Sequence, residues 1–114
     1  SFTGSPEVGT LVQKAAAERH IKCVLELGGK SPQLVFADAD LALAVPTLVK
    51  AIIQNAGQTC SAGSRVLVQR AVHDALVERL VAAFRATRAG APAMDCDCGP
   101  LINAAQRRRV EGFV

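Results

Sequence analysis

Short segments of strand-forming residues alternate in this chain with longer segments whose apolar residues have helical spacing. The strand-like segments are residues 21–27, 33–36 and 65–69. Helical patterns lie before the first segment, between the second and the third, and after the third,. Because helices and strands that alternate along a chain pack as layers, the pattern predicts an α/β fold. With 114 residues, of which 50% are hydrophobic, we expect one modest core,.

The first two predicted helices have recognisable start signals. Ser5 can cap a helix that continues to about Glu18,. The second pattern follows the acidic segment 38–40, and Pro46 should either delay the start of this helix or kink it,. The helix should stop near residues 55–57. Its apolar stripe consists of Leu41, Val45, Leu48, Val49, Ile52 and Ile53,.

Two further helices are predicted in the second half of the chain. One covers residues 72–88, and the other begins at Ala104,. Residues 90–100 contain proline, glycine and aspartate and are interpreted as a loop,. The amphipathic stripe of the longer helix contains Leu76, Val77, Leu80, Val81 and Phe84. This arrangement places Cys60 on a turn of small residues, between a helix end and the strand-like segment 65–69.

The charge of the chain argues against a nucleic-acid partner. Its 13 lysines and arginines and 10 acidic residues give a net charge of +3, and it has no tryptophan or tyrosine to stack on bases,. The one dense basic run, residues 107–109, is interpreted as a solvated helix face,. We therefore expect no nucleic acid among the partners.

Membrane and export signals are missing from the sequence. No apolar stretch approaches the roughly 20 residues that cross a bilayer, and residues 1–5 lack the basic and apolar regions of a signal peptide,. We therefore expect no membrane partner, a cytoplasmic location and four reduced cysteines,. Because the chain does not begin with methionine, we expect it to be an internal part of a longer polypeptide.

Cys60 and Glu26 are the two candidates for chemistry. Cys60 is surrounded by glycine, alanine, serine and threonine, which leave a thiolate open to an electrophilic carbon; an inert loop thiol is the alternative,. Glu26 lies in an apolar strand-like segment before two glycines. A buried carboxyl there would bind its proton more tightly and could act as a general base near neutral pH, whereas an outward strand position would leave it in solvent.

Three motifs occur in order along the chain. They are FTGSPEVG at residues 2–9, LELGGKSP at residues 25–32 and NAGQTCSAGSR at residues 55–65, and a weaker match is GPLI at residues 99–102. With these motifs the chain resembles an internal segment of the aldehyde dehydrogenase superfamily over essentially its whole length. The resemblance implies a fragment of a doubly wound α/β fold.

The resemblance also implies a division into two domains and a set of partners. Residues 1–30 would be the end of a dinucleotide-binding domain, and residues 31–114 would be the beginning of a catalytic domain. The partner would be a small-molecule aldehyde, and the full-length enzyme would be a homo-oligomer.

The activity implied by the resemblance is the oxidation of an aldehyde to a carboxylic acid with NAD or NADP. The cysteine matching Cys60 attacks the aldehyde carbon to give a thiohemiacetal, and the glutamate matching Glu26 activates the water that hydrolyses the later thioester. The backbone N–H of Cys60 would donate to the oxyanion, and a second donor, an asparagine, is expected upstream of residue 1. Asn55 does not match that asparagine and is expected to secure the turn before Cys60.

Five residues are expected to bind the cofactor by resemblance: Gly4, Ser5, Leu27, Gly28 and Gly29. Ser5 would contact the pyrophosphate from a helix N-terminus, although its hydroxyl equally fits a plain helix cap. The two glycines after Leu27 would let the nicotinamide approach the backbone closely. The family residues that bind the adenosine ribose are expected upstream, so the choice between NAD and NADP stays open.

Two other interpretations are weighed. The 114 residues alone could be an inactive part of such an enzyme that self-associates through unpaired strand edges,. Alternatively, Cys96 and Cys98, beside two aspartates, could belong to a redox or metal-binding protein, but no histidine at zinc spacing accompanies them and no metal site is predicted,. Cys23 is expected to be buried, and His20 and His73 are expected at surface or capping positions.

Overall fold

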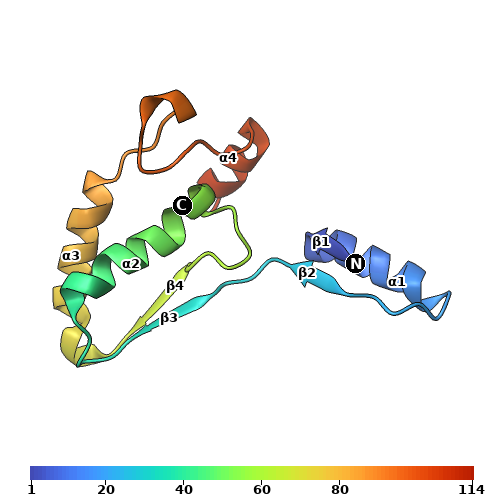
Figure 1. Cartoon of the computed structure of the whole chain (residues 1–114), viewed down its shortest axis with the longest axis horizontal. Helices are drawn as coiled ribbons and strands as arrows, with labels where there is room; N and C mark the ends of the chain where they lie inside the picture. The colour runs from blue at the N-terminus through green and yellow to red at the C-terminus, as the bar shows by residue number, and fades with distance from the viewer.

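The strands of this chain form two separate parallel pairs. In the computed structural model, which describes residues 1–114, β1 (Phe2–Gly4) pairs with β2 (Leu25–Leu27), and β3 (Pro32–Val35) pairs with β4 (Arg65–Val68). Figure 1 shows the first pair with helix α1 in one lobe and the second pair with helices α2 and α3 in another, joined by the extended segment after β2. The α/β prediction is confirmed.

The first lobe is a β-α-β unit. Ser5 caps α1 (Pro6–Ala17), because its hydroxyl oxygen accepts a hydrogen bond from the backbone N–H of Val8 at 3.4 Å,. The helix packs on both strands, and Gly9, its only buried residue, lies against the side chain of Leu27. The cap and the length of this helix agree with the sequence prediction.

The strand predicted over residues 21–27 is too long. Only Leu25–Leu27 form β2, because β1 offers three residues for parallel pairing and the register starts with Phe2 opposite Leu25. Cys23 therefore lies outside the sheet and is half-buried, so the expectation that it is buried is wrong. The partner strand, rather than local composition, sets the length of β2.

The second lobe contains the hydrophobic core. Helices α2 (Leu41–Ile53) and α3 (His73–Ala86) pack against each other and against β3 and β4. The predicted stripe is confirmed in α2, where Val45, Leu48 and Val49 are buried. In α3 it is confirmed only in part, because Leu76 is buried but Val77, Val81 and Phe84 are exposed. The core cluster consists of Val35, Val45, Leu48 and Leu76.

Pro46 does not delay the start of α2, contrary to one of the two expectations for it. The helix begins at Leu41, where Oδ1 of Asp40 accepts a hydrogen bond from the backbone N–H of Ala42 at 2.8 Å,. Pro46 lies inside the helix and cannot donate the usual bond to the carbonyl of Ala42,. The cap and the buried stripe are therefore sufficient to start the helix ahead of the proline.

The last helix, α4 (Ala104–Glu111), follows the predicted loop. Oδ1 of Asn103 caps it by accepting a hydrogen bond from the backbone N–H of Gln106 at 2.9 Å,. The basic run at 107–109 is exposed, as predicted, and Nε of Arg107 donates to Oε1 of Glu111 at 2.7 Å. None of the helices combines the length and the apolar character that a membrane span needs.

The two lobes form an elongated molecule, and one face of the sheet of β3 and β4 is exposed to solvent. The radius of gyration is 17.9 Å, whereas a compact chain of this length has about 13 Å. Leu34 is 62% exposed, Phe36 61% and Leu67 47%. Because a parallel sheet is ordinarily covered on both faces, these three side chains form an apolar patch without a partner.

We expect the isolated 114-residue chain to self-associate through this patch of Leu34, Phe36 and Leu67,. In sedimentation velocity, the average mass should rise with protein concentration. The double substitution Leu34→Lys and Leu67→Lys should suppress this rise, whereas Phe113→Lys, at an exposed position outside the patch, should not. A monomer that melts sharply and independently of concentration would contradict the prediction.

Candidate active site

Cys60 follows a left-handed turn at the end of α2. A 3-10 turn, Gln54–Gly57, succeeds the helix, with φ angles of 50° at Asn55, 55° at Ala56 and 76° at Gly57. Glycine adopts such angles freely, whereas a residue with a Cβ costs about 1–2 kcal/mol there. Backbone strain is therefore concentrated immediately before the candidate nucleophile.

Two side-chain amides hold this turn closed. Nδ2 of Asn55 donates to the carbonyl of Gln58 at 3.1 Å, and Nε2 of Gln58 donates to the carbonyl of Asn55 at 3.0 Å. The backbone N–H of Gln58 donates to the same carbonyl of Asn55 at 3.1 Å. Asn55 thus secures the turn before Cys60, as predicted.

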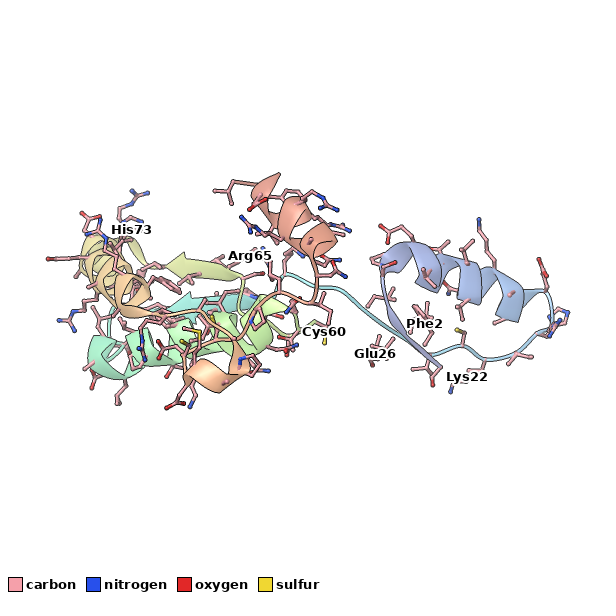
Figure 2. All side chains as sticks on the ribbon, turned by 90° about the horizontal axis from the view of Figure 1, so that it is seen from above. Phe2, Lys22, Glu26, Cys60, Arg65 and His73 are labelled. Atoms are coloured by element: carbon pink, nitrogen blue, oxygen red, sulfur yellow. The ribbon has the colours of Figure 1, made fainter.

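Cys60 and Glu26 line one cleft of about 690 Å³ between the lobes. Figure 2 shows Glu26 on the strand of the first lobe and Cys60 on the loop of the second, on either side of the gap. Four of the five residues expected to bind the cofactor also line the cleft: Gly4, Leu27, Gly28 and Gly29. A second groove, of about 740 Å³ between α2 and α3, contains none of the predicted site residues.

Glu26 is exposed rather than buried. Along β2, the side chains of Leu25 and Leu27 are half-buried and the intervening Glu26 faces outward. Of the two positions that the sequence left open, the outward strand position is therefore the observed one, and the carboxylate is not desolvated. The outward side of this strand faces the cleft, so Glu26 remains available to groups that enter it.

Ser5 is the one predicted site residue that does not line the cleft. Its hydroxyl caps α1 and also bonds to the carboxyl of Glu7; this bond, together with the backbone N–H of Glu7, holds the pKa of Glu7 below its ordinary value,. The charge of Arg109 lowers the pKa of Glu7 as well. The basic face of α4 therefore lies within electrostatic range of the first turn of α1.

Among the cleft residues that sequence reasoning misses are three with long polar side chains: Lys30, Gln58 and Gln106. Lys30 is the only cationic side chain in the lining, and its Nζ donates to the carbonyl of Gly29 at 3.0 Å. Gln106 reaches the cleft from α4. Neither periodicity nor composition marks these residues, and the place of Lys30 and Gln58 inside two of the motifs is the only signal for them.

Short contacts tie the segment between the lobes to the loop of Cys60. Nε of Arg65 donates to the carbonyl of Lys30 at 2.8 Å, and the backbone N–H of Arg65 donates to the carbonyl of Ser31 at 3.4 Å. A Cβ placed on Gly29 would lie 3.2 Å from the carbonyl oxygen of Cys60. The strand with Glu26 is thus anchored to the second lobe just beyond its end.

The remaining candidates have local roles. All four cysteines are free, and no cluster of three or more potential metal ligands occurs. Cys96 donates a weak hydrogen bond to the carbonyl of Met94 at 3.7 Å. His20 and His73 are exposed, as predicted, and Nδ1 of His73 lies 2.8 Å from Oδ1 of Asp74.

The fold and the cleft define an α/β protein in which an exposed thiol and a carboxylate from different lobes share one cleft. The sequence model of the Aldehyde dehydrogenase family matches residues 1–114. The chain therefore belongs to the aldehyde dehydrogenase family, which confirms the resemblance at the level of the family.

Three relatives illustrate the match. The chain is 44% identical to betaine aldehyde dehydrogenase of Bacillus subtilis (strain 168), covering 100% of this chain and 24% of that protein. The structure of lactaldehyde dehydrogenase from Escherichia coli is similar with a TM-score of 0.92 and 46% identity, over 96% of this chain and 24% of that one. Betaine aldehyde dehydrogenase from Staphylococcus aureus, solved in complex with NAD+, has a TM-score of 0.93 and 38% identity, over 98% and 22% of the respective chains. The chain thus spans about a quarter of the length of these relatives.

Proposed function

We propose that this chain is the catalytic segment of a longer enzyme that oxidises an aldehyde to a carboxylic acid with NAD+ or NADP+. The observation that carries the proposal is the shared cleft, in which Cys60 and Glu26 lie together with Gly28 and Gly29. A thiol and a carboxylate brought together from different parts of the chain suit a covalent mechanism with a separate hydrolytic step.

In the proposed reaction the thiolate of Cys60 adds to the aldehyde carbon and forms a hemithioacetal oxyanion. The backbone N–H of Cys60 stabilises this oxyanion. A nicotinamide held beside Gly28 and Gly29 would supply the acceptor for the hydride of this carbon, and Cys60 would then carry the acyl group as a thioester. Glu26 takes a proton from a water molecule, whose oxygen attacks the thioester and releases the acid and the thiolate. Aldehyde, water and the oxidised cofactor thus give acid, reduced cofactor and one proton.

The cleft has room for a nicotinamide beside Gly28. A Cβ added to Gly28 would meet no atom within 4 Å, so the backbone at this position borders open space. The Staphylococcus aureus relative was solved with NAD+, which supports a dinucleotide cofactor for this family member. The choice between NAD and NADP and the contact of Ser5 with the pyrophosphate are parts of the proposal.

Substitution of the two glycines tests this placement of the cofactor. In the full-length enzyme, Gly28→Ala should raise the dissociation constant of the cofactor about tenfold, because its methyl group occupies space reserved for the ring,. Gly29→Ala should instead lower kcat, because its Cβ would press on the carbonyl of Cys60 at 3.2 Å,. Isothermal titration with the cofactor and steady-state kinetics would separate these effects, and unchanged cofactor affinity in Gly28→Ala would contradict the placement.

The aldehyde itself is left open by the relatives. The named substrates of the relatives include betaine aldehyde and lactaldehyde, which differ in charge and in size. We propose a small-molecule aldehyde as the substrate class. We further propose that the boundary between the dinucleotide-binding and catalytic domains lies between residues 30 and 31, supported by the change of sheet between β2 and β3, and that the full-length enzyme is a homo-oligomer.

The alkylation rates of the four cysteines, resolved by peptide mapping with and without NAD+, test the proposed site directly. Cys60 should react much faster than Cys23, Cys96 and Cys98, and NAD+ should change only its rate,. Four equal rates that do not respond to NAD+ in the full-length enzyme would overturn the proposal. The same result confined to the isolated chain would favour the second candidate, an inactive and self-associating part of the enzyme, which the exposed sheet face supports.

A further inference from the structure

The side-chain amide of Gln58 makes hydrogen bonds to two segments that are far apart in the sequence. Its Nε2 donates to the carbonyl of Asn55 at 3.0 Å, within the left-handed turn before Cys60. Its Oε1 accepts a hydrogen bond from the backbone N–H of Ile102 at 2.9 Å, although the two residues are 44 positions apart in the sequence. One amide side chain thus joins the loop of the nucleophile to the segment that precedes α4.

The bond to Ile102 fixes the start of α4. Asn103, the next residue, caps this helix by accepting a hydrogen bond from the backbone N–H of Gln106. Gln106 itself lines the cleft that contains Cys60 and Glu26. These hydrogen bonds therefore connect the strained turn, through Gln58, to helix α4, which contributes Gln106 to the cleft lining.

The chemistry of the side chain suits this double role. An amide has a donor and an acceptor at one end, so Gln58 can satisfy the carbonyl of Asn55 and the N–H of Ile102 at the same time,. A carboxylate could accept from Ile102 but would face the carbonyl of Asn55 without a proton to donate. A thioether of the same length cannot donate and accepts only weakly.

We propose that Gln58 is a positioning residue. It fixes the position of the Cys60 loop relative to the start of α4, so that Cys60 and Gln106 face the same ligand. The inference rests on the proposed function for its kinetic consequence, since Cys60 must be the nucleophile for its position to control turnover. Gln58 acts through its two backbone partners and has no assigned contact with the reacting atoms.

The test compares Gln58→Met with Gln69→Met in the full-length enzyme. Gln69 is a matched control, because its Oε1 accepts a hydrogen bond from the backbone N–H of Ala37 at 2.8 Å but it does not line the cleft. We expect Gln58→Met to lower kcat about tenfold or more and to accelerate amide hydrogen exchange at Ile102 about tenfold. Gln69→Met should change neither quantity more than about twofold.

Gln58→Glu supplies a readout that a general loss of stability would not move. At neutral pH the introduced carboxylate cannot donate to the carbonyl of Asn55, so kcat should fall. As the pH falls and the carboxyl binds a proton, the donor returns, and kcat relative to wild type at the same pH should rise. A ratio that stays flat between about pH 5 and 8, or equal kcat in Gln58→Met and Gln69→Met, would overturn the inference.

Failure of the proposed function would give a different result. Wild-type enzyme would then oxidise no aldehyde, whereas exchange at Ile102 and the alkylation rate of Cys60 would still respond to Gln58→Met and not to Gln69→Met. Unchanged exchange at Ile102 in Gln58→Met would overturn the inference whether or not aldehydes are oxidised.

Discussion

Cys60→Ala in the full-length enzyme should lower kcat/KM for aldehyde oxidation by about 10⁴-fold or more. This is the largest effect expected of any single substitution here, because removal of the thiol eliminates the covalent intermediate and with it both steps of the proposed reaction. The measurement is the rate of NAD(P)H formation with a panel of aldehydes. Cofactor affinity should be nearly unchanged, since Cys60 contributes a small side chain to a cleft of about 690 Å³.

The other three cysteines provide matched controls. Cys23, Cys96 and Cys98 are half-buried and lie outside the lining of the cleft. Replacement of each by alanine should leave kcat/KM within a few-fold of wild type. Activity that survives in Cys60→Ala, or that disappears equally in all four variants, would contradict the assignment of the nucleophile.

Glu26→Gln should separate the two halves of the reaction. The amide is nearly isosteric with the carboxyl group but cannot take a proton from water, so steady-state turnover should fall by about 10²–10⁴-fold. Formation of the thioester does not need this carboxylate in the proposed mechanism. A rapid burst of about one equivalent of NAD(P)H per site should therefore remain, followed by slow turnover.

A rapid-mixing experiment measures this burst directly. Glu18→Gln is a suitable control, because Glu18 is also exposed and lies at the end of α1, outside the cleft lining. That variant should keep both the burst and the steady-state rate of wild type. Loss of the burst in Glu26→Gln would assign the carboxylate to the first step instead of the hydrolysis.

Local patterns predicted the helices of this chain well. The stripe of α2 and the caps at Ser5 and Asp40 depend on residues within one or two turns of one another, and the structure contains them. The strand before Glu26 was overestimated, since its length depends on a partner strand more than 20 positions away in the sequence, β1. Long-range pairing is the information that a local pattern lacks.

The residues of the candidate site likewise fall into those that the sequence indicates and those that depend on long-range contacts. Cys60 and Glu26 stand out in the sequence because of their unusual neighbours, and the structure places both in one cleft. The exposure of Glu26 could not be read from β2 alone, because an acid between two leucines fits either a buried or an outward position. Gln58 could not be singled out at all, since its bond to Ile102 joins distant parts of the chain.

The origin of Glu26 and Cys60 on different lobes has a consequence for how such an enzyme can change. In the proposed mechanism, the residue that forms the acyl group and the residue that releases it lie on separate pieces of polypeptide, linked at Lys30 and Arg65. A small rotation about this link would alter how long the acyl group survives without altering the nucleophile. Under the proposed mechanism, substitutions at this link would therefore change the lifetime of the intermediate separately from the rate of its formation.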